Sequence, residues 1–411
     1  MAEHEAKKSD RLTWFGSMPD NWNLSTISSL YDLRNEKVSD KDYPPLSVTM
    51  KGIVPQLESA AKTDNGDNRK LVKKHDFAIN SRSDRRGSCG ISSYDGSVSL
   101  INTVLTPREE MHPGYYNWLF HTVAFADEFY KWGHGIVNDL WSTRWQEMKR
   151  IVVPLPPLSE QSAIAVYLDD QCAKIDTLIA EAKDSIEEYK QWKASIIFEA
   201  VTKGLSPNVK MKSSGIEWIK EMPADWKIKK IKYVAETQTK RSENNANYIG
   251  LENVESGSGK IVSGKSNEFS AEGSSISINE GDVVFGKLRP YLAKCTVVKE
   301  SGCCSTEFIV LRPMSIDANF LKYSMLSPKF VDAVNMSTYG AKMPRANWTF
   351  IGDMKISLPS ISVQREIAEY LDEKGYIIDI LIYEKQNLVA DFELYKKSLI
   401  YETVTGKRKV V

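Results

Sequence analysis

Leu-Pro-Pro-Leu-Ser-Glu-Gln, at residues 155–161, is followed 203 positions later (358 − 155) by Leu-Pro-Ser-Ile-Ser-Val-Gln, at residues 358–364. The same offset carries Tyr167-Leu168-Asp169 onto Tyr370-Leu371-Asp372 without a gap. A second repeated pattern lies upstream of each copy, where Trp14, Pro19 and Trp22 recur as Trp218, Pro223 and Trp226. A unit this long exceeds the roughly 20 to 50 residues of a solenoid repeat, so the sequence predicts a duplicated domain pair in one chain.

Each copy contains a strand-rich segment followed by a helical segment. Short β-type runs, such as Asp282–Phe285 and Phe308–Leu311, alternate with turn sequences such as Gly257-Ser258-Gly259. We therefore expect an α+β fold in which two α/β globules alternate with two long helical regions. The predicted boundaries are 1–13 for an N-terminal tail, 14–154 and 218–357 for the globules, 155–205 and 358–411 for the helical regions, and 206–217 for a linker.

The two globules share a few aligned residues, called anchors here. The sequences between these anchors differ. Asp76, Ser99, Leu105 and Pro107 align with Asp282, Ser305, Leu311 and Pro313 at an offset of 206 residues (282 − 76). Because the sequences between these anchors diverge almost completely, we expect a duplicated scaffold that displays different side chains in its two copies.

The helical regions carry one apolar stripe each. After a proline-rich stop, Ser159 and Ser362 are predicted N-caps. A short helix is expected to end near Leu168 or Leu371, and a long helix to begin near Ile175 or Ile378. Apolar residues at alternating steps of three and four predict a heptad contact stripe. Its members are Ile175, Leu178, Tyr189, Trp192, Ile196, Ile378, Leu381, Leu388, Phe392, Tyr395 and Leu399.

A helix with a single apolar stripe needs a partner, and each copy is the other's natural partner. Two-fold pseudo-symmetry predicts an antiparallel coiled coil of helices about 28 residues, or about 42 Å, long. The alternative is a pair of core helices buried from several sides. The strongly charged positions outside the stripe favour the coiled coil.

Composition bounds the class of protein. The 411 residues suit two to four domains, and five cysteines without metal-ligand spacing indicate reduced thiols. With no apolar stretch near the ~20 residues of a membrane span, we expect a cytoplasmic protein. Lys+Arg and Asp+Glu both number 54, and this balance counts against nucleic-acid binding. The charges are unevenly distributed, however. Residues 227–354 contain 17 basic and 13 acidic residues, whereas residues 159–203 contain five basic and nine acidic residues.

Catalytic motifs are missing from the sequence. Gly257–Lys260 resembles half of a P-loop, but a turn is the better interpretation. There is no His-Glu-x-x-His and no Gly-x-Ser-x-Gly. A duplicated enzyme would carry its catalytic set in at least one half, so we expect a binding and scaffolding protein with no catalytic residue, metal ligand or cofactor of its own.

Basic and amide side chains cluster at comparable places in both globules. Lys and Arg neutralise phosphates, while Arg, Asn and Gln can read base edges. A solvated loop is the commoner explanation of one such cluster, but clusters at matching places with different identities favour two recognition modules. The candidate DNA-binding residues are Asn80, Arg82, Arg85, Arg86, Arg144, Lys240, Arg241, Lys287, Arg289, Tyr291, Lys342, Arg345 and Asn347. Trp145 and Trp348 are expected to be core anchors.

Several motifs resemble the specificity subunit of type I restriction-modification enzymes. The resemblance rests on Gly215–Trp226 entering the second globule, on Leu155–Gln161 leaving the first, and on Gly281–Tyr291 and Lys342–Trp348 within the second. It covers nearly the whole chain and is weaker in the first globule, where Asn80-Ser81-Arg82 stands at the place of Gly286-Lys287-Leu288.

The resemblance implies two target-recognition domains, each reading one half of a bipartite site in double-stranded DNA. It implies that the helical regions set the gap between the halves and dock two methyltransferase subunits. Those subunits use S-adenosylmethionine, and restriction subunits use ATP and Mg. Two alternatives remain: the specificity subunit of a related system that cuts on both sides of its site, and a protein-interaction scaffold with no role on DNA.

Overall fold

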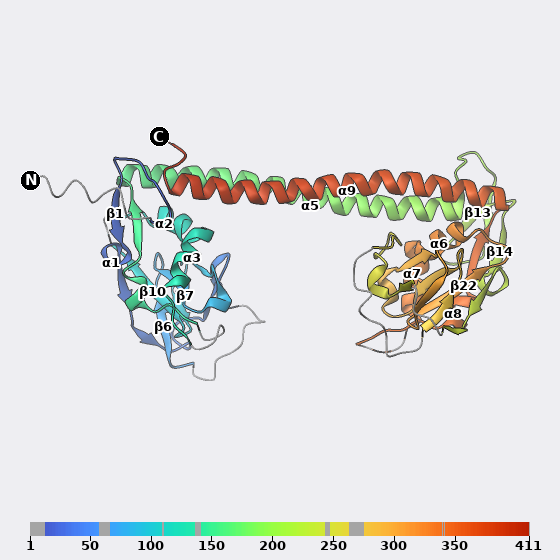
Figure 1. Cartoon of the computed structure of the whole chain (residues 1–411), viewed down its shortest axis with the longest axis horizontal. Coiled ribbons are helices and arrows are strands. Elements are labelled where there is room, and N and C mark those ends of the chain that lie inside the picture. The colour runs from blue at the N-terminus through green and yellow to red at the C-terminus, as the bar shows by residue number, and fades with distance from the viewer. Residues whose placement is uncertain are drawn as a thin grey trace, which may run out of the picture. The chain divides into compact units, whose positions relative to one another are not determined.

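The computed structural model describes residues 13–56, 66–108, 111–135, 141–242, 247–262, 275–338, 340 and 342–410, so most of the predicted N-terminal tail lies outside the described residues. The chain forms two compact units, made of residues 1–181 with 388–411 and of residues 182–387. Both divisions fall inside long helices, α5 (Leu158–Lys203) and α9 (Ile361–Val404), which are labelled in Figure 1. Each unit therefore contains part of both helices.

Each helical region is one uninterrupted helix, of 46 residues in α5 and 44 in α9. The predicted division into a short helix ending at Leu168 or Leu371 and a second helix from Ile175 or Ile378 is wrong. Neither intervening stretch contains proline, and Gly375 costs the helix only about 1 kcal/mol relative to alanine. Nothing in the sequence stops the helix there.

The predicted N-caps are also misplaced. Ser159 and Ser362 lie in the first turn of their helices rather than before it. The first intrahelical bonds reach back to the carbonyls of Pro157 and Ser360, at 3.0 and 2.9 Å. Those two residues therefore flank the helix starts, two positions earlier than predicted.

Four of the eleven residues of the predicted contact stripe are exposed. Ile175, Ile378 and Leu399 are buried as expected, and Tyr189, Ile196, Leu381 and Phe392 are half-buried. Leu178, Trp192, Leu388 and Tyr395 are 44%, 50%, 38% and 47% exposed, so they lie off the buried face. The residue after Leu178, Ile179, is buried in its place. Because both residues are apolar, spacing alone does not decide between a step of three and a step of four.

The first unit is built on antiparallel sheets covered by short helices. Its four-stranded sheet has the order β2-β10-β7-β8. These strands are Tyr31–Arg34, Asn102–Pro107, Phe77–Asn80 and Cys89–Ile91. A second sheet contains β3 (Lys37–Val38), β6 (Arg69–Val72) and β9 (Gly96–Val98), and a hairpin contains β4 (Leu46–Thr49) and β5 (Gly52–Pro55). The helices are α1 (Ile27–Leu30), α2 (Pro113–Phe120), α3 (Val123–Lys131) and α4 (Trp145–Met148).

The second unit has a four-stranded sheet with the order β15-β22-β19-β20. These strands are Ala235–Gln238, Phe308–Pro313, Val283–Gly286 and Cys295–Val297. A further sheet contains β16 (Arg241–Ser242), β18 (Ser275–Ile278), β21 (Gly302–Ser305) and β17 (Tyr248–Ile249), and a hairpin contains β12 (Met211–Ser213) and β13 (Glu221–Pro223). The helices are α6 (Ala318–Leu326), α7 (Pro328–Met336) and α8 (Trp348–Asp353).

The two four-stranded sheets are built alike. In the first, Pro107 pairs with Tyr31, and in the second, Pro313 pairs with Ala235. Each sheet also has a buried aspartate just before its third strand, Asp76 or Asp282, only 2% and 1% exposed. Arg34 of β2 and the Thr106 hydroxyl of β10 donate to Asp76, whereas Arg312 of β22 donates to Asp282. Equivalent acids are thus neutralised from different strands.

In each unit, an early strand pairs with the strand that precedes the long helix. Strand β1 (Asn23–Thr26) pairs with β11 (Val152–Leu155), and β14 (Lys227–Lys230) pairs with β23 (Lys355–Leu358). The last strand of each pair leads directly into a long helix. The repeated motifs that lie more than a hundred residues apart in each half of the sequence are therefore neighbours in the fold.

Within each unit, the parts of α5 and α9 run in opposite directions. In the first, Lys396 pairs with Asp176 at 2.6 Å, and Arg408 bonds with the earlier Tyr167. In the second, Lys193 pairs with Asp379 at 2.7 Å, and the Val201 carbonyl accepts a bond from Ser357, just before α9. The two ion pairs are equivalent in sequence, because 379 − 176 and 396 − 193 both equal 203.

A buried glutamine joins each long helix to its globule. Gln161 donates to the Pro156 carbonyl and accepts from the His112 amide, both at 2.8 Å. Gln364 donates to the Pro359 carbonyl at 2.9 Å and accepts from the Asp317 amide at 2.8 Å. Each side chain is 1% exposed, so its bonds have no competition from water. The repeated Gln therefore fixes where α2 or α6 begins relative to the long helix.

Replacing Gln364 by alanine leaves one buried N–H and one buried carbonyl without a partner. We expect a loss of about 1–3 kcal/mol in the free energy of unfolding. Urea denaturation followed by tryptophan fluorescence measures it. Gln386→Ala, at an exposed position of the same helix, is the control and should change little. Equal midpoints for the two variants would contradict the bridging role of Gln364.

Candidate nucleic-acid interface

Two basic segments of the first unit lie side by side beyond the end of β7. These segments, 80–86 and 141–144, are called the first loop pair here. The Thr143 amide donates to the Ser81 carbonyl at 3.0 Å, and the Ser83 amide donates to the Trp141 carbonyl at 3.1 Å. An isolated antiparallel bridge joins Arg82 to Ser142. Strand-like backbone bonds thus hold two stretches that are distant in sequence.

The second unit has a matching arrangement beyond the end of β19. Its segments, 287–293 and 342–347, are called the second loop pair. The Ala346 amide donates to the Lys287 carbonyl, and the Arg289 amide donates to the Pro344 carbonyl, both at 2.8 Å. A bridge joins Leu288 to Arg345. The sequence prediction had grouped these segments by composition, and the structure brings them into contact.

The two loop pairs share one backbone arrangement. Ser81 corresponds to Lys287 at an offset of 206 residues, and Thr143 to Ala346 at 203. The bridge that joins Arg82 to Ser142 in the first unit joins Leu288 to Arg345 in the second. At this bridge, the arginine is on the first segment in the first unit (Arg82) and on the second segment in the second unit (Arg345). The backbone frame is conserved between the halves while the charges on it are rearranged.

Most of the predicted cations are free to contact another molecule. Within the described ranges, seven of them make no side-chain hydrogen bond or ion pair, and all except half-buried Lys287 are exposed. They are Arg82, Arg144, Lys240, Arg241, Lys287, Arg289 and Lys342. Lys240 and Arg241 lie at β16, in a different sheet from the second loop pair. Arg85 has only the adjacent Asp84 within 3.7 Å.

Other candidates have partners inside the protein. Asn80 is 6% exposed and its side chain accepts from the Arg82 amide, so it shapes the loop from within. Asn347 caps α8 by accepting from the Phe350 amide at 3.3 Å. Arg86 pairs with Asp127 of α3. Composition alone does not separate these residues from free ones.

Arg345 is held by a carboxylate that sequence reasoning missed. Its guanidinium makes two bonds to Glu307, at 3.2 and 3.1 Å, and the Glu307 carbonyl accepts from the Lys287 amide at 2.9 Å. Glu307 therefore contacts both segments of the second loop pair. It lies 38 residues before Arg345, between β21 and β22, and no local pattern marks it.

The backbone of the second loop pair holds Arg289 in an unusual conformation. Arg289 and Ala293 have φ of 50° and 48°, in the left-handed region that L residues other than glycine rarely adopt. Pro290 between them is buried, and Tyr291 is 52% exposed. Non-glycine residues in this region cost about 1–3 kcal/mol and concentrate at functional sites. The arrangement presents the Arg289 and Tyr291 side chains on a loop anchored by Pro290.

The sequence interpretation of Trp145 and Trp348 agrees with their positions. Both are half-buried and pack against the apolar cores of their units. The Trp141 ring, by contrast, donates to the Tyr130 carbonyl at 2.8 Å and helps to hold the first loop pair. These indoles support the loops from behind.

The cysteines of the described part of the chain are buried thiols. Burial raises the pKa of Cys172 to about 11 and of Cys295 and Cys304 to about 12, so these thiols stay protonated at neutral pH. All five cysteines are free and buried. The described ranges hold no cluster of three His, Cys, Asp or Glu side chains suited to a metal ion.

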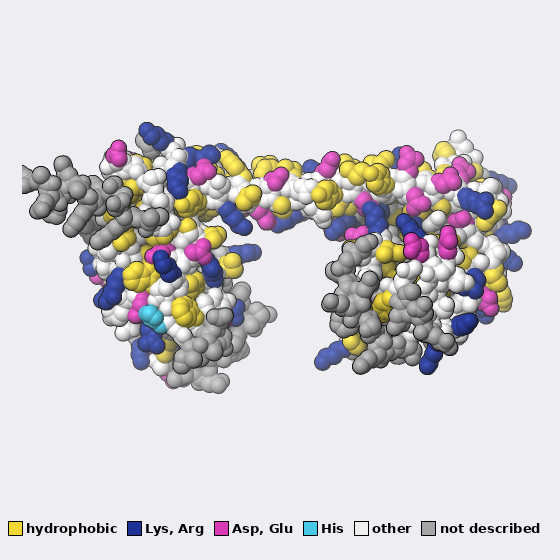
Figure 2. Space-filling view, in the orientation of Figure 1, with side chains coloured by type: hydrophobic (Ala, Val, Ile, Leu, Met, Phe, Trp, Pro, Cys, Tyr) yellow, Lys and Arg dark blue, Asp and Glu magenta, His cyan; other side chains and the backbone are white. Residues whose placement is uncertain are grey.

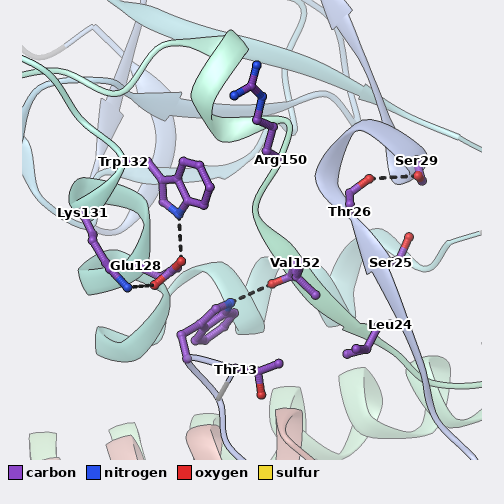
Figure 3. Close-up of a pocket in the computed structure, with 11 residues that line it drawn as sticks. Thr13, Leu24, Ser25, Thr26, Ser29, Glu128, Lys131, Trp132, Arg150 and Val152 are labelled. Atoms are coloured by element: carbon purple, nitrogen blue, oxygen red, sulfur yellow. Dashed lines mark hydrogen bonds and ion pairs between the residues drawn. The ribbon is translucent and has the colours of Figure 1, made fainter. Parts of the chain in front are cut away.

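The first unit contains a cavity of about 690 Å³ (Figure 3). No residue of the first loop pair lines it. Trp14, Trp132, Glu128 and Arg150 are among the side chains around it. Glu128 accepts from the Trp132 ring at 2.8 Å, and the Trp14 ring donates to the Val152 carbonyl at 2.7 Å. None of the predicted DNA-binding residues lines this cavity.

The long helices expose several large apolar side chains, and Figure 2 shows apolar side chains, in yellow, on the surface of the helical region. Trp192 of α5 and Tyr395 of α9 are 50% and 47% exposed, and they are equivalent in sequence because 395 − 192 is 203. Both helices also expose other large apolar side chains, such as Val166 and Leu394. Aromatic anchors of this kind are common at the centres of protein–protein interfaces.

Arg345→Met and Arg289→Met separate a held arginine from a free one. We expect Arg345→Met to lower the free energy of unfolding by up to about 1 kcal/mol, because its ion pair is partly exposed. Arg289→Met should leave it unchanged, since the guanidinium has no partner within the described ranges. Parallel urea titrations measure both, and equal losses would contradict the distinction.

The family model for the type I restriction modification DNA specificity domain matches residues 223–389. The specificity subunit of the type I restriction enzyme MjaVIII of Methanocaldococcus jannaschii is 27% identical over 71% of this chain and 70% of its own length. The Escherichia coli EcoDI specificity subunit is 22% identical over 62% of each chain.

Solved structures share the fold. A chain from a type I restriction-modification system, studied for its assembly and conformational transition, aligns over 95% of this chain and all of its own with a TM-score of 0.73 and 12% identity. The HsdS subunit of Thermoanaerobacter tengcongensis aligns over 95% of this chain and 98% of its own with a TM-score of 0.53 and 14% identity.

In the described ranges, no helix combines the length and apolar composition that a bilayer span requires. The family model, the curated relatives and the shared fold agree with one another and with the motifs in the sequence. Together, the family model and the curated relatives support the identification of the chain as a specificity subunit of a type I restriction-modification system.

Proposed function

We propose that the chain reads a bipartite site in double-stranded DNA, with the globule at 14–154 reading one half and the globule at 218–357 the other. The observation that carries this proposal is the shared backbone frame of the two loop pairs, which displays different side chains in each unit. A protein that reads two different half-sites needs one docking geometry and two sets of contacts. The free arginines and lysines supply both phosphate contacts and bidentate contacts to guanine.

The helical regions, 155–205 and 358–411, serve in this proposal as an antiparallel coiled-coil spacer that sets the gap between the half-sites. A helix advances about 1.5 Å per residue and B-DNA about 3.4 Å per base pair. One heptad of helix thus corresponds to about three base pairs. The opposed directions of α5 and α9 within each unit support the coiled coil.

The spacer also docks two copies of a methyltransferase subunit, which use S-adenosylmethionine to modify the DNA. Restriction subunits that use ATP and Mg join the same complex. The chain itself provides specificity without catalysis or a bound cofactor. The sequence-equivalent aromatics Trp192 and Tyr395 support two copies of one partner, because a duplicated chain offers the same anchor twice.

Selection from a randomised duplex library tests the DNA-reading role. The complex of this chain with its methyltransferase subunit should enrich two short sequences separated by a fixed gap. In the same selection, Arg289→Ala should relax one position of one half-site, at a cost of about 1–3 kcal/mol. A uniform loss of affinity would make Arg289 a phosphate contact, and a library that shows no enrichment would refute DNA reading.

Trp192→Ala and Tyr395→Ala test the docking surface. Removing a buried aromatic anchor typically costs 2 kcal/mol or more, so we expect each variant to bind one methyltransferase copy tightly and the second weakly. Mass measurement by light scattering gives the stoichiometry. Gln191→Ala, at an exposed neighbouring position, is the control. Two tightly bound copies in the double variant would exclude these residues as anchors.

A further inference from the structure

Asp379 and Asp176 hold equivalent positions in the repeat, yet their surroundings differ. Each pairs with a lysine of the other long helix, Asp379 with Lys193 at 2.7 Å and Asp176 with Lys396 at 2.6 Å. The Asp176 side chain is 59% exposed, while that of Asp379 is only 22% exposed. Something more than the helix pair covers Asp379.

The additional cover comes from the second globule. Lys260 places its Nζ 2.7 Å from Asp379 Oδ2, so one carboxylate is shared between two lysines. Lys193 belongs to the helix pair and Lys260 to the globule. In the described part of the first unit, Lys396 is the single ion-pair partner of Asp176. The contact between globule and helix through this aspartate is therefore a feature of one half only.

Lys260 ends a tight turn, residues 255–260, that is firmly held. The Glu255 amide donates to the Lys260 carbonyl at 2.9 Å. Gly259 has a φ of +68°, and a Cβ there would lie 2.0 Å from the Cys295 carbonyl oxygen. Only glycine fits such an approach. This explains the Gly-Ser-Gly-Lys sequence as the tight packing of a turn, in agreement with its interpretation as a turn.

The same turn touches the second loop pair. The Gly257 amide donates to the carbonyl of Ala293, the last residue of segment 287–293, at 3.1 Å. The next residue, Lys294, donates from its side-chain amine to the Leu251 carbonyl at 2.6 Å. A continuous series of contacts thus runs from the helix pair through Asp379, Lys260 and Gly257 to the loop that displays Arg289.

We propose that Lys260 is a positioning residue for specificity, which through Asp379 fixes the second loop pair on the spacer helices and so restricts the gap between half-sites. This inference rests on the proposed DNA-reading function. The ion pair is half open to solvent, with Lys260 54% exposed. Such pairs contribute modestly to stability, so its loss loosens the placement of the loop without unfolding the unit.

Three variants in the complex with the methyltransferase subunit test the inference. Lys260→Met removes the link and keeps the Lys193–Asp379 pair. Asp379→Asn weakens both pairs and keeps the charge of Lys260. Asp176→Asn makes the same change at the equivalent position, where there is no link to a globule in the described residues. Selection from the randomised duplex library reports half-sites and gap lengths together.

We expect Lys260→Met and Asp379→Asn to raise the fraction of selected duplexes whose gap differs by one base pair by about two- to fivefold. The half-site sequences and the Asp176→Asn distribution should match the unaltered complex. A uniform loss of affinity in Lys260→Met with an unchanged gap distribution would make Lys260 a phosphate contact and overturn the inference.

Amide hydrogen exchange without DNA separates this inference from the proposed function. Exchange at Gly257 and across segment 287–293 should quicken in Lys260→Met and Asp379→Asn and stay unchanged in Asp176→Asn. Unchanged exchange in the first two variants overturns the positioning role whatever the selection shows. If exchange quickens but the complex selects no bipartite site, the DNA-reading function is refuted, and the positioning of the loop by the Lys260–Asp379 ion pair still stands.

Discussion

A buried amide at the start of each long helix fixes the place where helix and globule meet. Gln161 and Gln364 each satisfy one carbonyl from the proline-rich stop and one amide from the start of the helix that covers the sheet. Pairing of an early strand of each unit with the strand that precedes the long helix brings the entry and exit of the chain to the same place. The two loop pairs begin where β7 and β19 end, and these strands belong to the sheets that the junction joins to the long helices.

The displayed side chains differ between the two loop pairs, while the pattern of backbone hydrogen bonds is the same. The first loop pair shows Arg82 and Arg144, and the second shows Lys287, Arg289 and Lys342, over the same pattern of backbone bonds. Affinity for a polyanion needs only the charge, whereas sequence selection needs each charge at a defined place. A frame held by backbone bonds satisfies both needs, since no side chain that contacts the ligand is required to hold the loop.

Sequence reasoning recovered the resemblance to type I specificity subunits and the mixed helix and sheet content, because these depend on motifs and periodicity. It failed where a choice depends on distant neighbours. Leu178 and Ile179 are equally apolar, and only packing buries the second. Asn80 looked like a surface reader until its burial was known, and Arg345 is held by Glu307, which nothing local marks. Continuity of the helices could have been inferred from the lack of proline.

The two buried aspartates are neutralised in different ways. Asp76 is neutralised from β2 by Arg34, while Asp282 is neutralised from β22 by Arg312, at the position that Thr106 occupies in the first sheet. A buried carboxylate that loses its partner costs about 3–5 kcal/mol. A sheet with neither arginine would therefore bury an unpaired carboxylate, whereas a sheet with both would keep its aspartate neutralised if either one were replaced.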